Sequence, residues 1–257
     1  MTTGAMILLQ LFGCDALNKA FSSVGGLTDA TVVQGAVLGI EVPDDPRLAP
    51  FLEGTDFAPG TAVTVFVADA TSIADLGNAP VDGGVVTVSG DISEDVPGLG
   101  GGLYATDPSS SELEYTDGAQ WVVDVDTDGT VGTAILDLPP AAAFDVEPIH
   151  EPGAPMTIDL SGQGFQSSVA VVIDEQGTVT WTNAPTDISG LYAAMDSDDA
   201  GVVEIPGSAF AGEGLYAVGV AAMSHTNAED LTGINTALSK LRVGKMRIVP
   251  VSTIPLP

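Results

Sequence analysis

Short apolar runs rich in Val, Ile and Thr recur along the chain from Thr31 onward, separated by turns rich in Gly, Pro, Asp and Ser. In many of these runs apolar residues alternate with small or polar ones, so that a strand buries one face and exposes the other. Many short strands separated by turns are typical of β-sandwiches and barrels. We therefore predict an all-β fold, with its clearest strands at 32–42, 61–68, 85–90, 120–125, 130–138, 156–162, 168–174, 177–182, 201–205, 214–223 and 246–251.

The second half of the chain repeats a pattern found in the first half. The sequence DGGVVTV at 82–88 is followed by GLYA at 102–105, and DAGVVEI at 199–205 is followed by GLYA at 214–217. A third GLYA lies between them, at 190–193. Glycine permits a tight entry into the strand, and the tyrosine ring packs with its hydroxyl bonded nearby. The repeat predicts two units with the same order of turn, strand, loop and strand.

A proline-rich stretch at 138–155 separates the two repeats. Proline at high density removes backbone donors from a sheet and fixes an extended path. We predict two β-sandwich domains in tandem, at 30–148 and 149–257, after a signal-like segment at 1–14 and a linker or short helix at 15–29. A single continuous sandwich is the alternative. The stretch contains five of the 17 prolines, namely Pro139, Pro140, Pro148, Pro152 and Pro155.

The charge of the chain is strongly acidic. Asp and Glu number 35 against 6 Lys and Arg, which gives a formal net charge of −29. A nucleic-acid partner is excluded, because phosphate binding requires a basic surface. Adsorption to anionic lipid headgroups is disfavoured for the same reason, so membrane attachment requires a hydrophobic or covalent anchor. We expect the acidity to keep an exported protein soluble and monomeric; life in high salt and binding of divalent cations are the alternatives.

An apolar run from Ala5 to Gly13 precedes Cys14, which is the only cysteine of the chain. The run is too short to cross a bilayer, which takes about 20 apolar residues, but it suits a signal peptide. The sequence Leu11-Phe12-Gly13-Cys14 resembles the lipobox of bacterial lipoproteins. The resemblance implies cleavage before Cys14 and acylation of this residue, which would attach the exported protein to a membrane of the cell envelope. A buried cysteine in an N-terminal strand is the alternative.

The strand order of the two repeats resembles that of immunoglobulin-like or fibronectin-like domains in bacterial surface proteins, in which a Gly-x-Tyr sequence opens a late strand. The chain lacks the cysteine pair of antibody domains, because Cys14 stands alone. The resemblance implies domains that serve as binding or spacer modules.

Three alternating aspartates form the best candidate metal site. Asp124, Asp126 and Asp128, followed by Gly129, match the start of an EF-hand-type calcium loop. The twelfth position holds Ile135 where the loop requires Glu. The preferred reading is therefore a β-hairpin whose turn is Asp128-Gly129, with Asp124 and Asp126 pointing to water. Calcium is the only cofactor that the sequence suggests.

Four of the six basic residues gather near the C-terminus, at Lys240, Arg242, Lys245 and Arg247. We expect them on a hairpin strand, where Lys240 and Arg242 share a face, as do Lys245 and Arg247. Three roles compete: pairing with the acidic body, protection of an exposed sheet edge, and docking of an acidic partner. The first two rank ahead of partner binding.

No catalytic motif is present, and the only histidines are His150 and His225. A triad of His225, Asp230 and a distant serine finds no support in the spacing, and a loop histidine is the preferred reading. We expect a lipid-anchored, non-enzymatic envelope protein that binds a protein or polysaccharide, or acts as a spacer. The alternative is a carbohydrate-binding or calcium-binding accessory domain of a secreted hydrolase system, which requires exposed Trp121 and Trp181.

Overall fold

The computed structural model describes residues 31–52, 60–70, 79–107, 111–184 and 199–254. Strands dominate these residues, so the predicted all-β fold is confirmed. All the strands that the alternation pattern predicts are formed. Cys14, the segment 15–29 and the third GLYA lie outside the described residues. The described helices are short: η1 (Pro46–Leu48), α2 (Ala49–Leu52), η3 (Gly207–Phe210) and η4 (Ala228–Asp230).

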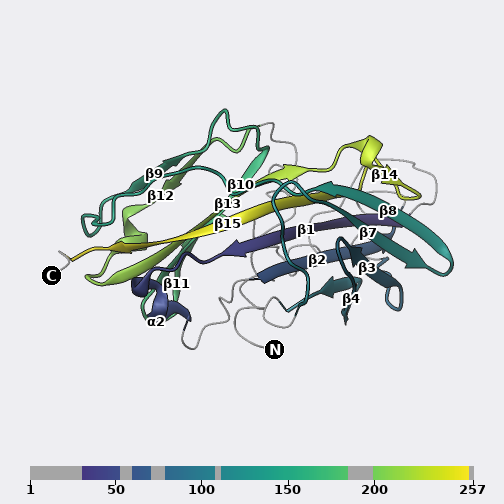
Figure 1. Ribbon diagram of the computed structural model, residues 1–257, viewed down its shortest axis with the longest axis horizontal. Coiled ribbons are helices and arrows are strands. Elements are labelled where there is room, and N and C mark those ends of the chain that lie inside the picture. Colours follow the sequence, from purple (N-terminus) through teal and green to yellow (C-terminus); the bar gives the residue numbers. More distant parts are fainter. Residues whose placement is uncertain (1–30, 53–59, 71–78, 108–110, 185–198, 255–257) are drawn as a thin grey trace.

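One eight-stranded sheet runs along the molecule and contains strands from both halves of the chain (Figure 1). Its central strand, β15, pairs in parallel with β1 on one side and antiparallel with β13 on the other. The two predicted domains therefore share a sheet, and their division near residue 148 stays a prediction. In spatial order the strands are β11 (Val179–Thr182), β10 (Ser167–Asp174), β13 (Leu215–His225), β15 (Lys240–Ser252), β1 (Thr31–Glu41), β2 (Gly60–Asp69), β6 (Leu103–Ala105) and β5 (Gly98–Gly100).

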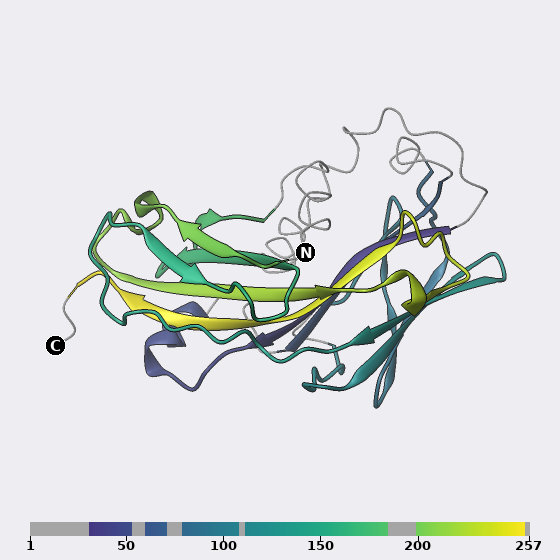
Figure 2. The same ribbon diagram turned by 90° about the horizontal axis from the view of Figure 1, so that it is seen from above.

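Two smaller sheets lie at opposite ends of the long sheet, as Figures 1 and 2 show. One has five strands, in the order β14 (Leu231–Thr232), β8 (Thr130–Asp137), β7 (Gln120–Thr127), β3 (Val85–Ser89) and β4 (Ser93–Val96). The other has two strands, β12 (Val202–Ile205) and β9 (Met156–Asp159). Each smaller sheet packs on the long sheet as in a sandwich, which buries the apolar face of both layers.

Strand β15 contributes to all three apolar cores of the described residues. Leu241 and Val243 belong to the core beneath the five-stranded sheet, and Val251 belongs to the core beneath β9 and β12. Met246 and Ile248 point to the opposite face, where η1 and α2 cover the long sheet. Because successive residues of a strand point to opposite faces, this one strand organises both sides of the sheet.

The internal repeat corresponds to equivalent strands in the two halves. The first strand of each repeat, β3 or β12, lies in a smaller sheet, and the second, β6 or β13, lies in the long sheet. The Tyr104 hydroxyl donates to the Val81 carbonyl at 3.0 Å, and the Tyr216 hydroxyl donates to the Gly212 carbonyl at 3.1 Å. The predicted role of the two tyrosines is thus confirmed.

The segment before β15 also carries an apolar pattern with helical spacing, at Leu231, Ile234, Leu238 and Leu241. These four side chains are buried, but 231–232 form β14, 236–238 form a turn and Leu241 belongs to β15, so a helix does not form there. Gly233, at φ 71°, favours a turn because glycine adopts this backbone conformation without strain.

We predict that the two halves unfold together, because they share β15. Trp121 lies in the core beneath the five-stranded sheet, and Trp181 packs against the core beneath β9 and β12, so each tryptophan reports on one half. Single-tryptophan variants, Trp121→Phe and Trp181→Phe, should give the same midpoint when urea unfolding is followed by fluorescence. Two separated transitions would contradict a shared cooperative unit and support independent domains.

Candidate functional site

The three aspartates of the candidate calcium loop lie on the β7–β8 hairpin. Asp128 and Gly129 have φ of 53° and 84°, which matches the predicted two-residue hairpin turn. The Asp126 Oδ1 atom accepts the Gly129 N–H at 2.9 Å, and the Asp124 Oδ1 atom accepts the Thr133 hydroxyl at 2.7 Å. Among the described residues, no group of three or more His, Cys, Asp or Glu side chains is arranged to hold a metal ion.

The four basic residues lie on one continuous strand, β15, which pairs antiparallel with β13. Because β1 and β13 pair with β15 on both sides from Arg242 to Arg247, the basic segment does not lie at a sheet edge, and the expectation of edge protection is wrong. Lys240 and Arg242 point to one face of the sheet, and Lys245 and Arg247 point to the other. Arg242 is only 3% exposed, and burial lowers its pKa to about 10. This guanidinium is thus not part of a surface for docking an acidic partner.

Lys245 holds together two segments that are distant in sequence. Its Nζ atom lies 3.2 Å from the Glu41 carboxylate at the end of β1 and 3.0 Å from the Asp117 carboxylate before β7. Burial alone would lower the pKa of Lys245, but the hydrogen bonds and charges of both carboxylates outweigh it and raise the pKa. The ammonium also lies 5.9 Å from the centre of the Tyr115 ring. The expected pairing with the acidic body is therefore confirmed for Lys245.

Arg247 makes a similar contact with the proline-rich stretch. Its Nη1 atom donates to the Phe144 carbonyl at 3.2 Å, and its guanidinium carbon lies 5.5 Å from the centre of the Phe144 ring. Stacking on an aromatic ring suits the planar, weakly hydrated guanidinium. Lys245 and Arg247 thus anchor two connecting segments to the central strand.

His225 and a serine form a close pair that the sequence spacing did not reveal. The Ser167 hydroxyl lies 2.9 Å from His225 Nε2, because the start of β10 pairs with the end of β13. Ser167 is only 5% exposed, so a substrate would not reach its oxygen in this conformation. Asp230, the third member considered for a triad, instead accepts hydrogen bonds from the backbone and side chain of Asn227. The arrangement supports a structural pair rather than an activated nucleophile.

A polar hollow of about 280 Å³, which we call the junction groove, lies where the end of β8 passes the end of β13. It is lined by residues 135–139, by residues 224–227, and by Gln166, Asp230 and Val243. Asp137 and Asp230 supply carboxylates, and Lys and Arg are absent from the lining. No sequence pattern predicts this groove, because its walls come from four separate segments of the chain.

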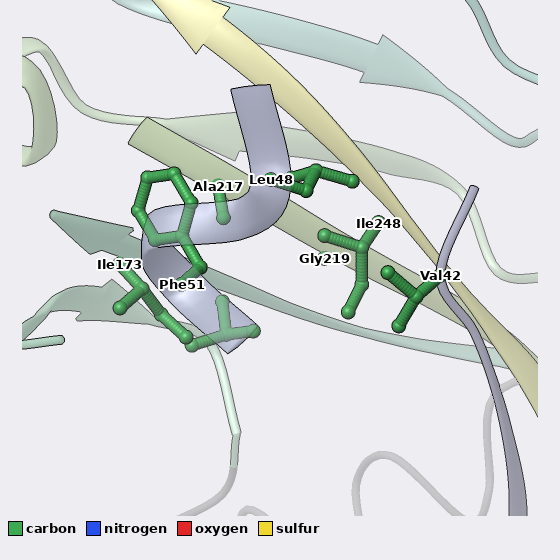
Figure 3. Close-up of a pocket in the computed structure, with 8 residues that line it drawn as sticks. Val42, Leu48, Phe51, Ile173, Ala217, Gly219 and Ile248 are labelled. Carbon is green, nitrogen blue, oxygen red and sulfur yellow. The ribbon is translucent and has the colours of Figure 1, made fainter. Parts of the chain in front are cut away.

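A second hollow lies between α2 and the opposite face of the long sheet (Figure 3). Leu48 and Phe51 reach down from the helical turn toward Ala217, Gly219 and Ile248 of the strands. Its lining is entirely apolar, and its volume of about 10 Å³ is far below that of a typical ligand site. We interpret this hollow as an imperfection of core packing.

The two tryptophans do not form an exposed platform for sugar rings. Trp121 is 3% exposed within the first core, and Trp181 is half-buried against the core beneath β9 and β12. Sugar stacking requires accessible aromatic faces, so their burial counts against the carbohydrate-binding alternative.

Comparisons with known proteins do not assign the chain to a family. The chain matches no protein-family model, and no curated protein matches it. Helices of the described residues are all too short to cross a membrane.

We predict that Asp126→Ala destabilises the protein by about 1 kcal/mol, because it removes the hydrogen bond to the Gly129 amide. Urea unfolding would measure the change. Asp128→Asn is the matched control, since asparagine tolerates a positive φ and should leave stability nearly unchanged. Calcium in place of a chelator should not shift the melting temperature; a rise that Asp128→Asn abolishes would establish the calcium loop instead.

We also predict a loss of stability above about pH 10 that involves Tyr115. Burial, assisted by the charge of Asp117, raises the pKa of Tyr115, so the folded state favours the neutral phenol. The unfolded phenol ionises near pH 10, and stability therefore falls as the pH rises beyond that value. Tyr115→Phe should cost about 1 kcal/mol at pH 8, because it loses the bond to the Pro139 carbonyl. The same variant should flatten the alkaline loss in urea titrations, and an unchanged pH profile would contradict this assignment.

Proposed function

We propose that the protein is an exported, lipid-anchored component of a bacterial cell envelope that acts as a non-enzymatic binding or spacer module. The observation that carries the proposal is Cys14, the only cysteine, placed directly after Leu11-Phe12-Gly13 at the end of an apolar run. The net charge of −29 supports a covalent anchor, because an acidic surface is repelled by anionic headgroups.

The architecture of the body is compatible with this role. Sandwich cores at both ends of one long sheet give an extended body that would hold a binding surface away from a membrane. The Ser167–His225 pair is too buried to favour catalysis, which supports a binding role over an enzymatic one.

We predict that the wild-type chain, expressed in a bacterium with lipoprotein processing, enters the detergent phase on phase partitioning. Cys14→Ser should move it to the aqueous phase, because acylation then has no thiol. Mass spectrometry of the N-terminus should find acyl chains on Cys14 in the wild type only.

The matched control moves the cysteine out of the lipobox. Adding Ser23→Cys to the Cys14→Ser chain restores a thiol but not its context, and should leave the protein aqueous. A wild-type protein that stays aqueous and unacylated would refute the anchor.

A further inference from the structure

We propose that β1 (Thr31–Glu41) and β15 (Lys240–Ser252) form a tension-bearing clamp, which resists a pull applied between the chain before β1 and the chain after β15. The clamp belongs to the folded body. Its use deepens the proposed spacer role and rests on that role for the source of the load, because an anchor ahead of β1 would pull on the start of this strand.

The direction of the two strands determines how such a pull acts. β1 and β15 run the same way along the molecule (Figures 1 and 2), with Gln34 paired to Lys240 and Glu41 paired to Arg247. A pull on the start of β1 and on the end of β15 therefore acts at opposite ends of the pair and tends to slide one strand past the other. The hydrogen bonds of a parallel ladder are evenly spaced along it, so sliding strains them together rather than one after another.

Each strand of the clamp is also held by its other neighbour. The pairing of β1 with β15 spans eight positions, that of β1 with β2 spans ten, and that of β15 with β13 spans eleven. Because both strands lie inside the eight-stranded sheet, β1 slides out only if its ladders to β2 and β15 break together. The same holds for β15 between β1 and β13.

Buried hydrogen bonds fix the start of β1, where the load would enter. The Val33 N–H donates to the Ser239 hydroxyl at 3.0 Å, and the Gln34 side chain donates through Nε2 to the Leu238 carbonyl at 2.9 Å. Both acceptors belong to the segment directly before β15, so these bonds join the two parts of the clamp. A buried bond is costly to break, because its donor is left unsatisfied. These bonds therefore oppose the first displacement of β1.

The test is single-molecule force spectroscopy of the full-length chain carrying Cys14→Ser, pulled from an N-terminal handle and from a second handle on a new cysteine. Ile254→Cys, at an exposed position beyond β15, loads the clamp along its strands. Asp69→Cys, also exposed, places the second handle opposite Thr31 on β2, so the same N-terminal pull peels β1 and β2 apart pair by pair. The two chains differ only in the second point of attachment.

We expect the highest rupture force to be at least about twofold larger for Ile254→Cys than for Asp69→Cys, because forced unfolding is governed by the unfolding rate and bonds that break together raise its barrier. Since Cys14→Ser removes the thiol for acylation, this result does not depend on the anchor. Phase partitioning of the wild-type chain tests the anchor separately.

A variant before β15 distinguishes the clamp from general stability. Ser239→Ala removes the hydroxyl that accepts the Val33 N–H. It should lower the rupture force of the Ile254→Cys chain and leave that of the Asp69→Cys chain unchanged, because peeling β1 from β2 does not load this bond.

Thr133→Ala is the matched control, because it removes a side-chain hydrogen bond to Asp124 on the β7–β8 hairpin, outside the loaded strands. It should change neither rupture force. Circular dichroism melts establish that each variant is folded; if Ser239→Ala is not, the two pulling points decide alone, since they require substitutions only at exposed positions. The proposal is overturned if both pulling points give the same force, if Ser239→Ala lowers both forces equally, or if Thr133→Ala weakens the clamp as much as Ser239→Ala does.

Discussion

The parallel pairing of β1 with β15 is the constraint on which the rest of the structure depends. It places the last strand of the chain beside the first described one, so that neither half completes its layer without the other. The outer neighbours of this pair approach so closely that glycine is required: a Cβ atom at Gly35 of β1 would clash with the Thr64 carbonyl oxygen of β2, and one at Gly244 of β15 would clash with that of Ala222 of β13. Contacts so distant in sequence are formed late and slowly, because closing a long loop costs entropy before the contacts compensate for it.

This shared strand also explains why scarce positive charge is concentrated near the C-terminus. Between the two smaller sheets the face of β15 is covered by connecting segments rather than by strands. Lys245 binds Asp117, and Arg247 binds the Phe144 carbonyl and ring, so two cations hold these connections in an acidic protein. Such partly exposed pairs contribute little stability individually. Their value is that they fix where connecting segments cross the sheet.

Much of the fold could be predicted from the sequence, but the pairing of its strands could not. Alternation of apolar residues is local, so it identified the long strands and the Asp128-Gly129 turn. β4, β5 and β14 were missed because they are short and carry little apolar pattern. The expectation of edge protection for the basic residues was wrong, because only long-range pairing decides which strand lies at an edge.

The difference between local patterns and long-range packing also holds for the candidate sites: a motif can be found in the sequence, but the junction groove cannot. The aspartates of the β7–β8 hairpin match a motif, yet Asp124 and Asp126 each accept a hydrogen bond that a β-hairpin explains. Asp137 and Asp230 match no motif, and they line the same groove only because the end of β8 packs beside η4 and the end of β13. Asp137 is exposed and Asp230 is half-buried, so water and salt screen both carboxylates, as expected where acidity serves solubility. The groove itself arises only when four distant segments of the chain pack together, and no local motif marks such a place.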